Sequence, residues 1–256
     1  MEVTIDNLGK VYTSRGGEEV VALREVSTSI RSGEFVTLVG PSGCGKTTLL
    51  DIVAGLTPAT VGEVRFGSNG GQHRVGLVFQ RPVLLPWRTA EENVYLPAQV
   101  GTEPPAGEDA GELRRRAREL LDLVGLGRFA EKYPWELSGG MQQRVAIARA
   151  LLLEAHVMCL DEPFAALDEF TREQMHLELL RIWEQQGFTA IFVTHNIFES
   201  VFLSDRVLVM TPRPGRVVAE VEIDLPRPRE KEMIGTDVFG ANVRKIRDVM
   251  AEHWSE

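Results

Sequence analysis

The sequence predicts an α/β protein whose core is a mostly parallel sheet, and two observations support this fold class. Apolar runs of strand length recur along the 256 residues: FVTLVG, RVGLVFQ, HVMCLD, TAIFVTH and RVLVM. Most of them are continuous rather than alternating, as in strands that helices cover on both faces. Segments of helical periodicity lie between these runs, and such alternation of strand and helix is typical of a parallel sheet.

The helices of this core can be placed in order along the chain. GKTTLLDIVAGL follows the first apolar run, and SGGMQQRVAIARALLLEA precedes the third. LDEFTREQMHLELLRIWEQQG follows the third run, and we expect this helix to end at a glycine cap, Gly187. A last amphipathic helix, from Asp237 to Trp254, could pack against the core or touch a partner, and the sequence does not choose between these.

Two segments depart from the alternation. Residues 2–30 alternate like antiparallel strands, with SRGGEE as their turn, and residues 88–153 are mostly helical apart from GTEPPAGEDAGE, which predicts a mobile loop. We therefore expect a single domain with three parts. An N-terminal antiparallel β-subdomain and the α/β core take residues 1–87 and 154–225, a helical subdomain is inserted at 88–153, and 226–256 form a tail too short for a domain.

Composition excludes several classes of protein. The net charge is −9, and the densest basic run, LRRRAR, lies among acidic residues like a solvated helix face, so we expect no nucleic-acid partner. Two cysteines, Cys44 and Cys159, lack metal-ligand spacing and suggest reduced thiols in the cytosol. The sequence contains no run of about 18 apolar residues, the length that would predict a membrane span. Any membrane part of the system would therefore belong to another chain.

The stretch GPSGCGKTT predicts a phosphate-binding loop. Its pattern G-x-x-x-x-G-K-[ST] lies between an apolar strand and a helix, the context that the motif requires. The loop Gly40, Pro41, Ser42, Gly43, Cys44 and Gly45 would turn backbone N–H groups toward phosphate oxygens at the start of a helix. Lys46 would reach the β- and γ-phosphates, and the hydroxyl of Thr47 would bind Mg²⁺.

Polar side chains end two further apolar strands. Asp161 and Glu162 follow HVMCL, at a strand end where carboxylates face a ligand crevice. We expect Asp161 to hold Mg²⁺ through water and Glu162 to orient or deprotonate an attacking water; the alternative is a helix cap. His195 ends TAIFVTH and could contact the γ-phosphate, although a lone histidine after a strand is more often structural.

The stretch LSGGMQQR predicts a second phosphate-binding surface. Ser138 could cap a helix whose first turn holds Gly139 and Gly140. One nucleotide cannot easily use this surface and the Gly40 loop of the same chain. A head-to-tail homodimer resolves the conflict, because the loop of one subunit would face the Ser138 helix of the other with ATP between them.

With these motifs in this order, residues 1 to about 225 resemble the ATP-binding-cassette (ABC) family of transport ATPases, whose defining motif LSGGMQQR matches. The resemblance implies a RecA-like core and further roles. Tyr12 would stack on adenine, Thr48 would assist at the phosphates, and Gln142 would belong to the motif that binds nucleotide. Gln80 would sense Mg²⁺ and the attacking water and couple hydrolysis to the membrane partner, and Asp168 would contact the other subunit of the dimer.

Weaker motifs resemble the branch of this family that imports nitrate, taurine and alkanesulfonates. They are RPVLLPWRTAEENV at 81–94, TPRPGRV at 211–217 and IDLPRPR at 223–229. Each has a plainer reading, since Trp87 could lie in the core, PRPG makes a good hairpin turn, and LPRPR could be a stiff linker. Asn196 and Phe198 stand where the family often has acids, which leaves the exact subfamily open.

The resemblance implies an ATP-hydrolysing, energy-coupling subunit of an importer, with ATP and Mg²⁺ bound. It would be peripheral on the cytoplasmic face of the membrane, with permease subunits as direct partners and a solute-binding protein as an indirect one. The alternatives are an ABC ATPase acting on DNA or ribosomes, an exporter subunit, or an importer of an unrelated solute such as an amino acid. A P-loop kinase would leave the Ser138 motif without a purpose.

Overall fold

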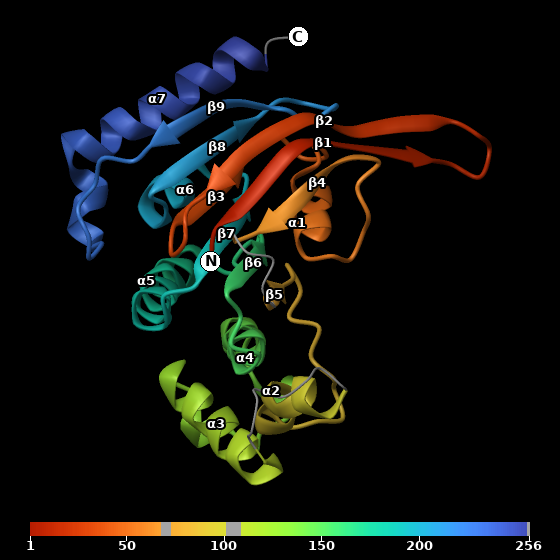
Figure 1. Ribbon diagram of the computed structural model, residues 1–256. Coiled ribbons are helices and arrows are strands. Elements are labelled where there is room, and N and C mark those ends of the chain that lie inside the picture. Colours follow the sequence, from red (N-terminus) through yellow and green to blue (C-terminus); the bar gives the residue numbers. More distant parts are fainter. Residues whose placement is uncertain (68–72, 101–108, 255–256) are drawn as a thin grey trace. The chain divides into compact units, whose positions relative to one another are not determined.

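A computed structural model of the chain describes residues 1–67, 73–100 and 109–254, and it divides into two units (Figure 1). Unit 1 comprises Met1–Gln72 and Phe188–Glu256, and unit 2 comprises His73–Gly187. The predicted loop GTEPPAGEDAGE falls mostly on residues 101–108, outside the described residues. The boundaries that the sequence suggests for the subdomains stay a prediction.

Unit 1 begins with an antiparallel sheet of order β2-β1-β4, made of Val3–Thr13 (β1), Glu19–Ile30 (β2) and Val61–Phe66 (β4). β1 and β2 pair from Val3 with Ile30 to Thr13 with Glu19 and form a long hairpin. Its turn is closed where Gly17 N donates to Ser14 O at 3.0 Å, and Gly17 has a φ of 82°. The alternating pattern of residues 2–30 therefore predicted this part of the fold correctly.

The second sheet of unit 1 runs in the order β7-β3-β8-β9, and its strands are Phe35–Val39 (β3), Thr189–Thr194 (β7), Arg206–Met210 (β8) and Val217–Glu222 (β9). β3 is parallel to both β7 and β8, and all residues of β3 and β7 are buried. Two helices, Lys46–Val53 (α1) and Ile197–Leu203 (α6), follow β3 and β7 in the chain. This arrangement agrees with the predicted α/β fold class.

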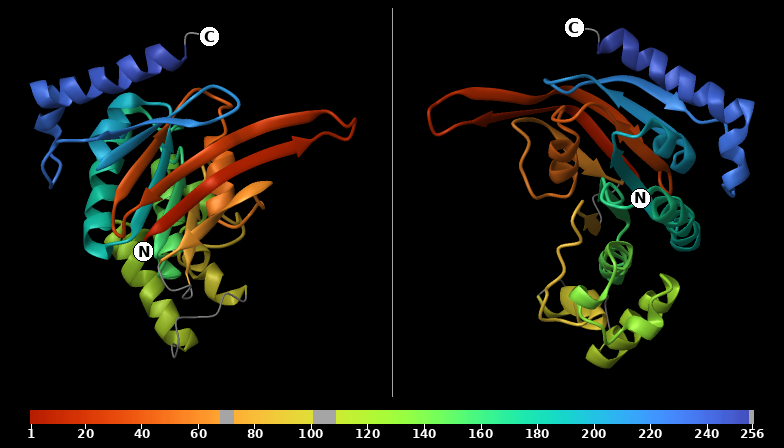
Figure 2. Two further views of the ribbon diagram at one scale, coloured as in Figure 1. Left: turned by 45° about the horizontal axis from the view of Figure 1, so that its top comes forward. Right: turned by 180° about the vertical axis from the view of Figure 1, so that it is seen from behind.

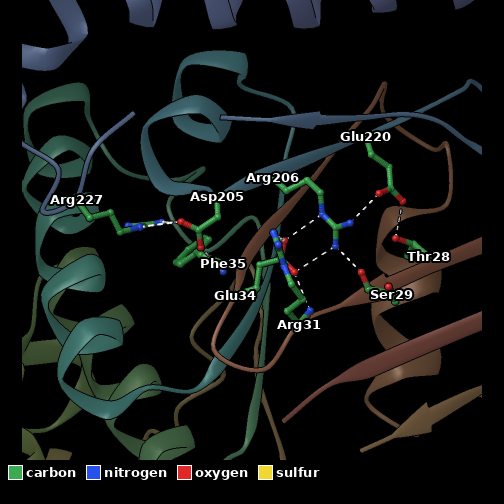
Figure 3. A network of polar contacts seen from close by, with 9 residues as sticks. All are labelled: Thr28, Ser29, Arg31, Glu34, Phe35, Asp205, Arg206, Glu220 and Arg227. Carbon is green, nitrogen blue, oxygen red and sulfur yellow. Dashed lines mark hydrogen bonds and ion pairs between the residues drawn. The ribbon is translucent and has the colours of Figure 1, made fainter. Parts of the chain in front are cut away.

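An ion-pair network connects the strands of unit 1 (Figure 3). Glu34, just before β3, is only 5% exposed, and its carboxylate lies 3.1 Å from Arg206 Nε. Arg206 Nη1 also contacts Glu220 of β9 at 2.7 Å, and Glu220 accepts a hydrogen bond from Thr28 of β2 at 2.7 Å. Arg31 adds a backbone N–H bond of 2.7 Å to Glu34. Arg206 and the carboxylates of Glu34 and Glu220 thus join β2 to β8 and β9, which lie far from it in the sequence.

The C-terminal segment of unit 1 forms a short 3₁₀ helix, Lys231–Gly235 (η3), and a long helix, Asp237–His253 (α7). Figure 2 shows α7 lying along β9 from two sides. Its buried face carries Phe239, Val243, Ile246 and Met250. The helix therefore packs against its own core, one of the two possibilities that its amphipathic pattern allowed.

Unit 2 holds one parallel pair of strands, Val75–Val78 (β5) and Val157–Asp161 (β6), and the helices that lie between and after them in the chain. The α-helices are Ala90–Gln99 (α2), Ala110–Leu123 (α3), Gly139–Leu152 (α4) and Glu169–Gln186 (α5), and the 3₁₀ helices are Gly127–Phe129 (η1) and Pro134–Glu136 (η2).

Local sequence fixes the ends of the unit 2 helices. Thr89 and Glu92 form a capping box on α2, and Asp109 and Glu112 form one on α3. α5 ends at Gly187, whose φ of 68° is the left-handed conformation predicted for a glycine cap. In the described ranges, no helix combines the length and the hydropathy needed to cross a bilayer.

Candidate active site

The predicted site residues fall into two groups, one in each unit. Unit 1 carries Tyr12, the loop Gly40–Gly45 with Lys46, Thr47 and Thr48, and His195. Unit 2 carries Gln80, Ser138, Gly139, Gly140, Gln142, Asp161, Glu162 and Asp168.

The predicted phosphate-binding loop connects β3 to α1. Gly43 has a φ of 78° and Gly45 a φ of 105°, conformations that favour glycine. A Cβ at Gly45 would lie 2.7 Å from Leu23 Cδ2 and 2.9 Å from Ala22 O, so the loop fits against β2 only with glycine there. Gly45 is also the N-cap residue of α1, where the helix N–H groups open toward the loop.

Lys46 and Cys44 occupy the inside of this loop. Lys46 is only 5% exposed, and its ammonium donates hydrogen bonds to Gly40 O at 2.8 Å and Pro41 O at 3.0 Å. Cys44 is 1% exposed, with its Sγ 3.9 Å from Lys46 Nζ. Burial raises the pKa of the Cys44 thiol, which the nearby ammonium only partly opposes. Cys44 is therefore a neutral, packed thiol at pH 7.

We expect Cys44 to react slowly with iodoacetamide in the folded protein. Its pKa is raised above the ordinary thiol value, so the thiolate fraction at pH 8 is lower than that of a free cysteine, and the buried sulfur is also shielded. Timed alkylation followed by peptide mass spectrometry measures the rate, with glutathione as the free-thiol control. Labelling of Cys44 at the rate of glutathione would contradict this description of the loop.

His195 follows the strand next to the one that leads into the loop. Thr194 pairs with Val39, so His195 and Gly40 both continue from paired residues at the same edge of the sheet. Asn196, the departure from the family pattern, is the N-cap of α6, and its Oδ1 accepts from Phe198 N at 2.9 Å and Glu199 N at 3.3 Å. The residue type at 196 thus has a local structural reason.

Tyr12 lies on β1 with 42% of its surface exposed. The ammonium of Lys10 lies 5.0 Å from the centroid of its ring, and the same group donates to Pro58 O at 2.7 Å. An exposed, electron-rich ring of this kind can stack on a purine. Its proposed role at adenine stays a prediction.

Sequence reasoning missed the contacts that the β8–β9 turn makes with the loop. Arg213 Nε donates to Gly43 O at 3.2 Å. A Cβ at Gly40 would lie 3.2 Å from Met210 Cβ, so the end of β8 packs directly on the first glycine of the motif. TPRPGRV, which the sequence analysis gave as a branch resemblance or a hairpin turn, does connect the antiparallel strands β8 and β9, and it also supports the phosphate-binding loop.

In unit 2, Gln80 and the two acids follow paired strands. Val78 of β5 pairs with Leu160 of β6, so Gln80 and Asp161 leave the sheet at the same edge. Glu162 has a φ of 42°, the left-handed region that non-glycine residues rarely adopt. Strain of this kind gathers at functional positions because the surrounding structure must impose it.

Ser138 is the N-cap of α4, as the sequence predicts, and its hydroxyl accepts from Met141 N at 3.3 Å. A Cβ at Gly140 would lie 3.1 Å from Thr171 Cγ2, so the first turn of α4 packs closely on the start of α5. Asp168 caps α5 by accepting from Thr171 N at 3.0 Å, and this hydrogen bond lowers the pKa of its carboxyl. Ser138 and Asp168 are thereby brought to neighbouring helix starts.

Gln142, predicted as part of the nucleotide motif, turns toward its own unit instead of away from it. Its side-chain amide donates to Pro134 O at 2.9 Å and Leu137 O at 3.1 Å. The group therefore holds the turn that leads into Ser138. Any contact with nucleotide stays a prediction.

Helix α4 also holds the segment that follows Gln80. Gln143, which is 2% exposed, donates to Phe79 O at 3.1 Å. Arg149 donates to Pro82 O and Val83 O, both at 2.9 Å, and burial lowers the pKa of its guanidinium. The backbone on both sides of Gln80 is therefore fixed to the helix that begins at Ser138.

Trp87 is held outward by a buried asparagine. Its side chain is 69% exposed, which excludes the core position that the sequence allowed. Asn93, fully buried in α2, accepts from Leu85 N at 2.8 Å and donates to Arg88 O at 3.1 Å and Thr89 O at 2.9 Å. These bonds form the turn on which Trp87 projects, and they explain the asparagine near the end of RPVLLPWRTAEENV.

Comparisons with known proteins agree on one family. The family model described as "ABC transporter" matches residues 23–165. The aliphatic sulfonates import ATP-binding protein SsuB of Bacillus cereus is 43% identical over 90% of this chain and 90% of its own length. The nitrate import ATP-binding protein NrtC of Synechococcus elongatus is 43% identical over 91% of this chain, which spans 36% of that longer protein. The dimeric ATP-binding cassette MJ0796, solved with ADP and Pi, matches with a TM-score of 0.74 and 36% identity, covering 88% of this chain and all of that one.

Proposed function

Because the chain belongs to the ABC transporter family, we propose that it is the ATP-hydrolysing, energy-coupling subunit of an importer for a small anionic solute. Two copies bind two ATP molecules at a shared head-to-tail interface. They act from the cytoplasmic face on separate transmembrane permease subunits. A solute-binding protein delivers the solute to those subunits. The relatives compared above are ATP-binding proteins named for sulfonate and nitrate import, and taurine is itself a sulfonate.

The observation that carries this proposal is the capped helix α4. A Ser138 cap followed by Gly139 and Gly140 presents backbone N–H groups at a helix start, in addition to those of the Gly40 loop and α1. A P-loop enzyme that works alone needs one such cradle. A second one on the same chain is explained by a nucleotide held between two copies.

The residues predicted to bind Mg²⁺ fit that ion chemically. Thr47, Gln80 and Asp161 offer a hydroxyl, an amide carbonyl and a carboxylate, the hard oxygen donors that Mg²⁺ prefers. The ion would neutralise charge on the β- and γ-phosphates. Within its unit, Gln80 leaves the same sheet edge as Asp161, so the unit 2 donors share one edge.

Catalysis would consist mainly of positioning and charge neutralisation. The N–H groups of Gly43, Gly45 and the first turn of α1 would bind phosphate oxygens, and Lys46 would exchange its two carbonyl partners for them. Glu162 would orient or deprotonate the attacking water, and His195 would contact the γ-phosphate. The start of the Ser138 helix of the partner copy would complete the set of groups that bind the negatively charged phosphates.

Co-purification tests this proposal. A tagged Glu162→Gln chain would be extracted from native membranes in mild detergent with ATP, and the bound proteins would be identified. A polytopic membrane protein is expected. Recovery of ribosomes or DNA with no membrane partner would overturn the transport function and favour an ABC ATPase of the mechanical kind.

The segment from Gln80 to Trp87 is the part of unit 2 best built to receive the membrane partner. Gln143 and Arg149 bind its backbone to α4, so a force applied near Trp87 would be passed to the helix that begins at Ser138. Trp87 is 69% exposed on a turn that Asn93 makes rigid, and large exposed aromatics are typical anchors of protein interfaces.

Replacing Trp87 with alanine should weaken coupled transport more than nucleotide binding. We expect solute uptake to fall about tenfold, as for loss of an interface anchor worth about 1.4 kcal/mol, with the Kd for ATP unchanged. Uptake of taurine, an alkanesulfonate and nitrate in cells carrying the variant, together with ATP titration of the purified chain, measures both. Trp135→Ala, which removes another tryptophan that is 68% exposed, is the matched control. Equal loss of uptake and ATP binding would contradict this role.

A further inference from the structure

The segment around His195 is tied to the helix that follows it, α6. His195 lies between the last residue of β7 and the N-cap of α6. Thr194 Oγ1 bonds to the carboxylate of Glu199, and Asn196 N donates to Thr194 Oγ1 at 3.0 Å. The chain on either side of His195 is therefore fixed to the first turn of α6, and His195 must follow any movement of that turn.

The outer side of this first turn is covered by α7. The ring of Phe198 lies 6.0 Å from that of Phe239, centroid to centroid, at 32° between their planes. The guanidinium of Arg247 lies 5.6 Å from the centroid of the Phe198 ring. Phe239 is 1% exposed, whereas Phe198 keeps 47% of its surface accessible, so Phe198 packs on a buried ring while staying partly open to solvent. Both Phe239 and Arg247 come from α7.

The last turn of α6 is held by the segment LPRPR, which precedes η3 and α7 in the chain. Arg227 Nη2 donates to Leu203 O at 2.8 Å, and Arg229 Nη2 donates to Ser204 O at 2.7 Å. Arg227 Nε also donates to Asp205 Oδ1 at 2.8 Å (Figure 3). These guanidinium groups supply donors to carbonyls that a helix end leaves without partners. The segment LPRPR thus fastens α6 instead of acting only as a linker.

Trp254, which directly follows α7, reaches the end of β8 beside the phosphate-binding loop. Trp254 Nε1 donates to Met210 O at 3.0 Å, and a Cβ at Gly40 would lie 3.2 Å from that same oxygen. One helix therefore touches the turn that carries His195 and the strand end that supports the phosphate-binding loop. Buried apolar side chains pack α7 on the core, and the contacts with Phe198 and with Met210 O come in addition to that packing.

We propose that Phe198, clamped by Phe239 and Arg247 of α7, is a positioning residue that sets the place of His195, so that the C-terminal helix controls the turnover number of ATP hydrolysis. The inference rests on the proposed function and on His195 acting at the γ-phosphate. Phe198 does not touch the substrate. It acts by fixing the first turn of α6, to which both neighbours of His195 are bound.

Steady-state ATPase assays and ATP titrations of the full chain test this. Phe198→Ala should lower kcat about tenfold, because a small misplacement of a reacting group is costly, while the Kd for ATP changes less than about twofold on the same reasoning. Arg247→Ala should lower kcat by about twofold to fivefold, in keeping with one lost contact between a cation and an exposed ring. Phe198→Tyr should restore the wild-type rate. Lys245→Ala, which removes an exposed cation two residues from Arg247 on the same helix, is the matched control and should change nothing.

A double-mutant cycle separates positioning from general loosening. In a His195→Ala background, Phe198→Ala should have no further effect on kcat, because its effect passes through His195. The same loss of rate in both backgrounds would overturn the proposal, as would a wild-type rate for Phe198→Ala. A thermal melt of each variant shows whether it is folded. If Phe198→Ala does not fold, Arg247→Ala still tests the proposal. Failure of the wild-type chain to bind or hydrolyse ATP would instead overturn the proposed function, so the two failures are distinct.

Discussion

Glu162→Gln should nearly abolish ATP hydrolysis while leaving ATP binding intact. General-base assistance contributes about 10²- to 10⁴-fold to rate, so we expect the kcat to fall at least about 100-fold. Glutamine keeps the size of glutamate and removes only its capacity to accept the proton of the attacking water. Glu162 lies one residue beyond the end of β6, and its backbone is in the left-handed region. Phosphate release and a fluorescent ATP analogue measure the two properties separately.

The same variant should accumulate an ATP-bound dimer. In the proposed mechanism, ATP binding would close the two copies around nucleotide, and loss of hydrolysis would remove the step that reopens them. Size-exclusion chromatography with light scattering in the presence of ATP and Mg²⁺ should give twice the mass of the 28.5 kDa chain. Glu184→Gln makes the same charge change at an exposed position of α5 and should behave as wild type. A Glu162→Gln monomer with ATP bound would count heavily against the head-to-tail arrangement.

Much of the fold could be predicted because local chemistry decides it. Continuous apolar runs indicated strands that are covered on both faces, and β3 and β7 are indeed buried throughout. Ser138 and Gly187 could be assigned as helix caps because each role depends on a side chain or a φ angle that few residues supply. Such positions need no knowledge of distant residues.

The parts that could not be predicted all depend on distant residues. The amphipathic pattern of α7 shows that one face is buried, but it does not say which surface covers that face. Arg213 reads as a turn residue until the fold brings it to Gly43, 170 residues earlier. Phe198 reads as a departure from the family pattern until Phe239 is seen beside it. Long-range contacts of this kind carry no local signal in a single sequence.

The strained backbone of Glu162 could not be predicted either. Its φ of 42° has no signature in LDEPF, since glutamate does not favour that region. The phosphate-binding loop is the opposite case. Glycine at positions 40 and 45 indicates in the sequence itself that other atoms lie close to the backbone there. Function could therefore be predicted where it needs unusual residue types, and not where it needs unusual conformations of ordinary ones.

The buried ion pair between Arg206 and Glu34 should be the largest single electrostatic contribution to the stability of unit 1. Glu34 is 5% exposed, and the side chain of Arg206 is 12% exposed, so water compensates little for the loss of either partner. Arg206→Met would leave the carboxylate with Arg31, whose side chain is 70% exposed, and with one backbone N–H. Breaking a buried pair in this way costs about 3–5 kcal/mol, and we expect about 3 kcal/mol here.

Urea unfolding of Arg206→Met, Glu34→Gln and the double variant measures this contribution. The double variant should lose less free energy of unfolding than the two single losses added together, because the uncompensated charge is then removed with its partner. Arg65→Met is the matched control. Arg65 pairs with Asp6 and Glu63 on the same unit, but its side chain is 54% exposed, and such surface pairs contribute about 0–1 kcal/mol. Equal effects of Arg206→Met and Arg65→Met would mean that the network of Figure 3 joins the strands without stabilising them, and that packing alone holds β2, β8 and β9 in register.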